Sequence, residues 1–133
     1  MQSACDRFGN PERSFQAVHI AGTNGKGSTA AFLANMAAAA GRRVGLYTSP
    51  HLVKFTERIQ VGGQPISDDV AAELIERVLD AAPELTFFEV TTLVAFLAFK
   101  EAGVDFAVLE VGLGGRLDAT NVIPPPLVAV ITR

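Results

Sequence analysis

The sequence has little cysteine and no long apolar run, and each shortage excludes a class of protein. Cys5 is the only cysteine among the 133 residues, so no internal disulfide can form and nothing indicates an oxidising compartment. No apolar run reaches the roughly 18 residues of a membrane helix, and residues 1–10 lack the apolar core of a signal peptide. We therefore expect a cytoplasmic protein without a membrane partner, and interpret Cys5 as an ordinary thiol near a loose terminus.

The chain also lacks surplus positive charge. Its net charge is −3 and its pI is near 5.3. Nucleic-acid partners are held by an excess of Lys and Arg, so nucleic acid is not expected as the main partner, although a local basic site remains open. With 49% hydrophobic and 19% charged residues, the composition is that of a globular protein. A single domain over residues 1–133 with one core is expected.

The apolar pattern predicts alternating strands and helices. Buried strands are predicted at residues 16–21, 43–48, 106–111 and 127–132, and a hairpin at residues 58–66 turns at Gly62-Gly63. Helices are predicted at residues 28–40, 67–81 (with Ser67 as N-cap) and 89–102. This order predicts an α/β fold whose mostly parallel sheet binds ligands at the carboxyl ends of its strands. The sequence stops at Arg133, directly after a predicted strand, so we expect a truncated domain.

A glycine-rich loop between the first predicted strand and the next helix carries the strongest signal. The loop reads Gly22-Thr23-Asn24-Gly25-Lys26-Gly27-Ser28-Thr29. Glycines let backbone N–H groups surround phosphate oxygens, the helix start adds a positive dipole, and Lys26 adds a full charge. Ser28 or Thr29 offers a hydroxyl to a bound Mg²⁺. We predict ATP phosphates here with Lys26 as the catalytic cation; the alternative is a helix-capping turn without a ligand.

The loop departs from the strict phosphate-loop pattern G-x-x-x-x-G-K-[ST]. Ile20 occupies the first glycine position, and Gly27 follows the lysine. The departure counts against an ordinary GTPase or small-molecule kinase.

Two further residues at predicted strand ends are candidate magnesium ligands. Mg²⁺ prefers oxygen ligands and keeps several waters, so the hydroxyl of Ser49 and the carboxylate of Glu110 would suffice beside ATP. Taken alone, Ser49 is more typical of a turn, and His51 of a loop residue that makes hydrogen bonds. Glu110 ends an apolar strand, where a carboxylate is costly unless it is paired or metal-bound. An ion pair with Arg116 or another basic residue is the alternative.

Together these motifs resemble the folylpolyglutamate synthase/dihydrofolate synthase family of the Mur ligase superfamily. The resemblance covers residues 18–132. It is carried by three motifs: Gly-Thr-Asn-Gly-Lys-Gly-Ser, then Ser-Pro-His-Leu followed by Glu57-Arg58-Ile59, and finally Glu-Val-Gly-Leu-Gly-Gly-Arg-Leu-Asp-Ala-Thr-Asn from Glu110. The third motif is the most distinctive. It implies a P-loop-containing, Mur-ligase-like domain with ATP at the first motif and Mg²⁺ on Ser49 and Glu110. It also implies a substrate-binding segment at Thr86, Phe87, Phe88 and Glu89, where Phe88 and Glu89 are equally explained as core and helix-start residues.

The resemblance further implies a reaction and small-molecule partners. The carboxylate of dihydropteroate or a folate attacks the γ-phosphate of ATP, and the amino group of L-glutamate then attacks the resulting acyl phosphate. A further metal-binding histidine, a modified lysine and the C-terminal glutamate-binding domain are expected beyond Arg133, and the N-terminal helix is expected to be shortened. The alternatives are a cell-wall Mur ligase, disfavoured by Gly27 and the third motif, and a nucleotide-binding fragment without catalysis.

Overall fold

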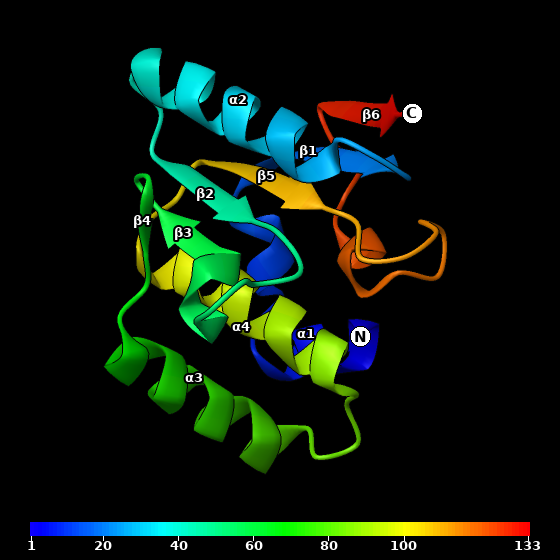
Figure 1. Ribbon diagram of the computed structural model, residues 1–133. Helices are drawn as coiled ribbons and strands as arrows, with labels where there is room; N and C mark the ends of the chain where they lie inside the picture. Colours follow the sequence, from blue (N-terminus) through cyan, green and yellow to red (C-terminus); the bar gives the residue numbers. More distant parts are fainter.

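The computed structural model describes residues 1–133 and contains a six-stranded sheet with helices on both faces (Figure 1). The strands are β1 (Gln16–Gly22), β2 (Val44–Tyr47), β3 (Ile59–Val61), β4 (Gln64–Pro65), β5 (Phe106–Glu110) and β6 (Val128–Thr132). The helices are α1 (Gln2–Arg7), α2 (Lys26–Ala39), α3 (Asp68–Ala81) and α4 (Phe87–Glu101). Three short 3-10 helices are η1 (Pro11–Arg13), η2 (Phe55–Arg58) and η3 (Ala119–Val122).

The sheet is mostly parallel, which confirms the predicted α/β class. The strand order is β4-β3-β2-β5-β1-β6; β2, β5, β1 and β6 run parallel to one another, and β3 runs antiparallel to β2. The predicted hairpin is confirmed as the antiparallel pair β3–β4 at one edge, where Gly62 (φ 59°) and Gly63 (φ 80°) make the turn. The parallel strands β1, β2 and β5 therefore present their carboxyl ends along one side of the sheet.

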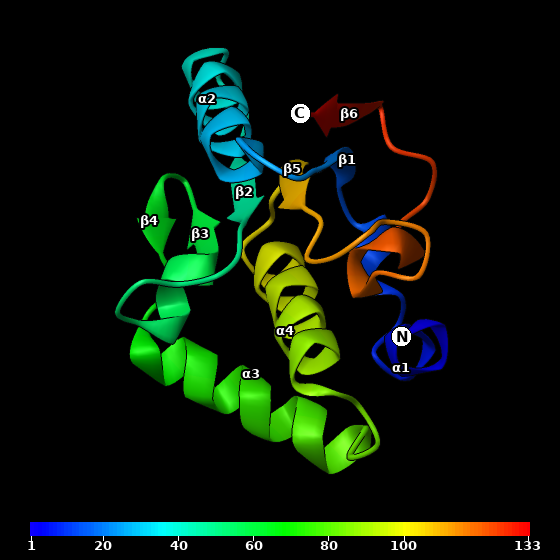
Figure 2. The ribbon, with the colours of Figure 1, turned by 45° about the vertical axis from the view of Figure 1, so that its right-hand side comes forward.

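The helices form separate layers on the two faces of the sheet. Helix α2 covers one face, while α4 lies on the other with α3 packed outside it (Figures 1 and 2). Ala107 and Leu109 of β5 belong to the core under α4, whereas Val108 belongs to the smaller core under α2. Side chains alternate along a strand, so Glu110 at the end of β5 lies on the α2 side.

Helices α3 and α4 follow the predicted patterns. Ser67 caps α3 by accepting a hydrogen bond from the Val70 amide at 3.2 Å, as predicted. The long buried stretch of α4, from Val90 to Phe99, confirms that this helix is buried on nearly all sides. This stretch lies between the sheet on one side and α3 on the other, which shields it from solvent.

Three local predictions were wrong. Helix α2 begins at Lys26 rather than residue 28, because Gly25 takes the left-handed conformation (φ 76°) immediately before it. Helix α4 begins at Phe87 rather than residue 89, because Thr86 is its N-cap. The N-terminus is not loose: Cys5 in α1 is fully buried, and burial raises the pKa of its thiol to about 12. None of the helices is both long and apolar enough to cross a bilayer.

Candidate functional site

The glycine-rich loop places a row of free backbone donors at the start of α2. No side chain caps the helix, and the amides of residues 25–28 have no hydrogen-bond partner in the chain. The first regular bond after the loop is the Thr29 amide to the Gly25 carbonyl at 2.9 Å. Unpaired N–H groups and the positive end of the helix dipole coincide here, which is the geometry that binds an anion.

The loop is fixed in place by the end of β6. Gly22 has φ 138°, and a side chain there would collide with the backbone and hydroxyl of Thr132. The Asn24 amide donates to the Arg133 carbonyl at 2.6 Å, and the Thr132 hydroxyl donates to the Ala21 carbonyl at 3.3 Å. Gly22 therefore allows the two strands to approach closely enough to hold the loop.

The structure brings three predicted site residues together at the carboxyl ends of β2 and β5. Glu110 is only 4% exposed. Its Oε1 lies 3.8 Å from the Lys26 ammonium, and its Oε2 accepts a hydrogen bond from the Ser49 amide at 3.0 Å. Gly27 faces the same carboxylate. The ion pair that the sequence left open for Glu110 is thus made with Lys26 and not with Arg116.

The donor set around Glu110 fits a small cation that brings most of its own ligands. Ser49 contacts Glu110 through its amide, so its hydroxyl is not used in that bond. The chain contains no group of three or more His, Cys, Asp or Glu side chains that could hold a metal by themselves. Mg²⁺ commonly takes one or two protein oxygens and completes its shell with phosphate oxygens and water. Ser49 and Glu110 satisfy that requirement.

A cleft beside the loop runs between the ends of β1 and β5. Its volume is about 430 Å³. The lining consists of the end of β1, the loop, the glycine-rich segment after β5 and one residue of β6, namely Ala21, Gly22, Thr23, Lys26, Val111, Gly112, Leu113, Gly114 and Ile131. The first and third sequence motifs therefore share one cavity.

The segment after Ser49 is ordered by a single carboxylate. Glu57 accepts hydrogen bonds from the amides of Leu52, Val53 and Lys54 at 2.7–3.1 Å. These backbone bonds hold the pKa of Glu57 below its usual value. The Ser-Pro-His-Leu motif and the following Glu-Arg-Ile are thereby folded into one unit.

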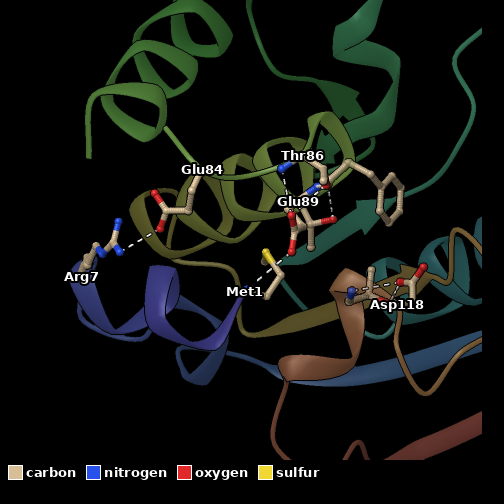
Figure 3. A network of polar contacts seen from close by, with 9 residues as sticks. Met1, Arg7, Glu84, Thr86, Glu89 and Asp118 are labelled. Atoms are coloured by element: carbon tan, nitrogen blue, oxygen red, sulfur yellow. Dashed lines mark hydrogen bonds and ion pairs between the residues drawn. The ribbon is translucent and has the colours of Figure 1, made fainter. Parts of the chain in front are cut away.

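The segment expected to bind substrate forms the N-terminus of α4. Thr86 and Glu89 make a capping box, in which the Thr86 amide donates to Glu89 Oε2 at 2.9 Å and the Glu89 amide donates to the Thr86 hydroxyl at 3.4 Å (Figure 3). Hydrogen bonds from Thr86, chiefly from its amide, lower the pKa of Glu89. The Met1 ammonium lies 3.6 Å from Glu89 Oε1. Glu89 therefore has a complete structural role at the helix start.

The two phenylalanines of this segment differ in their surroundings. Phe88 is half-buried, with its ring 6.1 Å from that of Tyr47. It also covers Gly112 so closely that a Cβ at Gly112 would collide with the ring. Phe87 is 64% exposed. Phe88 thus lies directly behind a residue that lines the cleft, whereas Phe87 points to a different surface.

The third motif is organised around Asp118. The Asp118 carboxylate accepts from the Leu113 amide at 2.9 Å, and from the amide and hydroxyl of Thr120 at 3.0 and 2.5 Å. The Thr120 hydroxyl donates its one proton to Asp118. His19 Nε2, which lies 2.7 Å from the hydroxyl oxygen, must therefore donate to it. Burial lowers the pKa of His19, which favours this neutral form.

Sequence reasoning did not single out His19 or Arg58. A histidine inside the apolar strand β1 and an arginine directly before the apolar β3 were the available signals. Both side chains are buried, at 9% and 8% exposure. The partner of His19, Thr120, lies 101 residues further along the chain, whereas that of Arg58, His51, lies only seven residues before it.

Known proteins are similar to this chain in sequence and fold, although no protein-family model matches it. It is 46% identical over 141 residues to the dihydrofolate synthase/folylpolyglutamate synthase of Bacillus subtilis, a match that covers 99% of this chain and 33% of that protein. Escherichia coli FolC in complex with DHPP and ADP has a TM-score of 0.93 at 42% identity, over 98% of this chain and 32% of that one. The bifunctional folylpolyglutamate synthase/dihydrofolate synthase of Yersinia pestis, complexed with AMPPNP and Mn ion, has a TM-score of 0.92 at 41% identity, again over 98% and 32%. The chain spans about a third of the length of the relatives that it matches.

Proposed function

We propose that the chain belongs to the folylpolyglutamate synthase/dihydrofolate synthase family, to whose members it is similar along nearly its whole length, and that it forms the ATP-binding part of a ligase that adds L-glutamate to a folate or dihydropteroate carboxylate. The observation that carries the proposal is the convergence of Lys26, Ser49 and Glu110 beside four free loop amides. A capping turn without a ligand would need neither the lysine nor the buried carboxylate.

Each element of the site has a distinct task in this proposal. The amides of residues 25–28 bind the terminal phosphates, and Lys26 neutralises the charge that spreads over the transferring phosphoryl group. Ser49 and Glu110 hold the divalent ion, proposed to be Mg²⁺, which would supply charge neutralisation at the phosphate oxygens. With such an ion on Glu110, the Lys26 ammonium would be available for phosphate.

The proposed chemistry needs no protein nucleophile. A carboxylate is a poor electrophile until its oxygen is converted into a better leaving group. The substrate carboxylate therefore attacks the γ-phosphorus, ADP leaves, and the amine of glutamate displaces phosphate from the acyl phosphate. The protein's contribution is to position the reactants and to stabilise charge.

We place the acceptor substrate next to the cleft, on the side of the segment Thr86–Glu89. Support comes from Phe88, which backs onto Gly112 of the cleft wall. Thr86 and Glu89 are assigned first to the helix cap, because their polar atoms already bond to each other. Phe88 is therefore the member of the segment whose contacts favour substrate binding most.

The test is nucleotide turnover by the full-length protein to which these residues belong. Phosphate release from ATP is expected only when L-glutamate and either dihydropteroate or a reduced folate are both present. Lys26→Ala is expected to abolish release while the circular dichroism spectrum stays unchanged. Release that depends instead on a muramoyl peptide would reassign the protein, and full turnover by Lys26→Ala would refute the phosphate role.

A further inference from the structure

Arg58 is a buried arginine without an acidic partner. It is 8% exposed and takes part in none of the ion pairs of the structure, whereas the far more exposed Arg7, Arg42 and Arg77 are all paired. Its Nε donates to His51 Nδ1 at 2.7 Å, and its guanidinium lies 5.7 Å from the centre of the Phe87 ring. These two contacts orient the guanidinium but leave its charge uncompensated.

The two terminal nitrogens of Arg58 are free donors that reach the molecular surface. Neither has a hydrogen-bond partner, and the only fully buried side-chain atom in that condition is Glu12 Oε2, so the terminal nitrogens retain contact with solvent. The adjacent Glu57 does not compensate Arg58, because its carboxylate is occupied by the amides of residues 52–54. A buried cation is costly when unpaired, so this arrangement favours an external anion.

The surroundings of Arg58 favour a carboxylate on an aromatic molecule over a phosphate. Arg58 lies on the α4 side of the sheet, beside Phe87 and near Tyr47, while Lys26 and the free amides lie at α2 on the other side. The start of α4 adds the positive end of a helix dipole. Guanidinium binds carboxylate through two parallel hydrogen bonds, and aromatic rings offer stacking area to an apolar ligand body.

We propose that Arg58, oriented by His51, binds a carboxylate of the folate-type substrate other than the one that attacks ATP. The inference rests on the proposed function, because it assigns a contact for the substrate of that same reaction. His51 is a positioning residue: its unprotonated Nδ1 accepts from Arg58 Nε and leaves the two terminal nitrogens directed at the ligand.

The experiment compares steady-state kinetics of the full-length protein with Arg58→Met, which keeps the side-chain length, and Arg58→Lys, which keeps the charge. The KM for a reduced folate, whose glutamate carries a second carboxylate, is expected to rise about 10- to 100-fold in Arg58→Met, the usual range for a lost charge-assisted pair. Arg58→Lys should lie between this variant and wild type, because it loses the planar fork. The KM for ATP should stay within about twofold. Arg77→Met, which breaks only exposed ion pairs, is the matched control and should change neither constant.

A double-mutant cycle tests the role of His51. His51→Ala should raise the same KM in the wild-type background but add little in the Arg58→Met background, because it acts through Arg58. If Arg58→Met does not fold, as its unfolding midpoint would show, Arg58→Lys decides alone. An unchanged substrate KM, or a rise confined to ATP or glutamate, would overturn the inference and leave the proposed function standing. A wild-type protein that turns over no folate-type substrate would instead overturn the proposed function.

Discussion

Replacing Glu110 with glutamine tests the site with little disturbance of the fold. At 3.8 Å, the Coulomb attraction of Glu110 and Lys26 is about 4 kcal/mol at an effective dielectric constant of about 20. Desolvation of the two ions offsets most of it. The Lys26 side chain is 18% exposed and can turn its ammonium to water, and the glutamine oxygen can still accept from the Ser49 amide. We expect the free energy of unfolding to change by less than about 1 kcal/mol.

The same substitution should change nucleotide affinity in opposite directions with and without a divalent ion. Without the ion, the Glu110 carboxylate repels the phosphates and holds Lys26, so its neutralisation should tighten ADP binding. With Mg²⁺ present, the substitution removes a charged metal ligand and should weaken binding. A unit charge several ångströms away in a partly buried site is worth about 1–3 kcal/mol, or roughly 5- to 150-fold in Kd in each direction.

Isothermal titration of ADP into wild type and Glu110→Gln, once with Mg²⁺ and once with EDTA, measures both effects. Chemical denaturation of the same samples checks the stability estimate. Weaker binding to the same extent under both conditions would refute the reasoning, because Glu110 would then act on the nucleotide independently of any metal.

Three further predictions concern the elements that support the site. Burial lowers the pKa of His19, so as pH falls below about 6.5 the unfolded chain takes up a proton that the folded chain does not. The contribution of His19 to stability is therefore fully present above that pH and should be lost below it. His19→Gln should remove this loss in denaturation curves measured from about pH 8 to 5. Thr86→Ala removes the N-cap of α4 and should lower the free energy of unfolding by about 1 kcal/mol, whereas an unchanged denaturation midpoint would show that the cap is not needed. Gly112→Ala places a methyl group against the Phe88 ring and should shift its aromatic NMR resonances and weaken substrate binding, while unchanged resonances would contradict the observed packing.

The sequence predicted the elements whose determinants are local. The glycine-rich loop, the Ser67 cap and the Gly62-Gly63 hairpin follow from conformational preferences within a few residues, and the structure contains all three. Helix starts were missed by two residues where the decisive feature was a left-handed Gly25 or a reciprocal cap at Thr86. Such features depend on backbone geometry that periodicity does not encode.

Contacts between distant segments were the part that the sequence could not supply. The pairing of Glu110 with Lys26 rather than Arg116 depends on which face of β5 the side chain occupies and on where α2 begins. The buried α1 and the isolated Arg58 likewise follow from tertiary packing. The joint placement of the three motifs was expected from parallel-sheet topology, but the side-chain contacts among them depend on tertiary packing.

The most direct test of the nucleotide site is a titration of the 133-residue chain with Mn²⁺·AMPPNP, followed by NMR. A bound paramagnetic ion broadens resonances of nearby residues only. The amides of residues 25–28, Ser49 and Glu110 are predicted to broaden first, while those of α3 stay sharp. Broadening that begins at the acidic residues of α3, or none around Lys26 at saturating nucleotide, would contradict the placement of phosphates and metal at this loop.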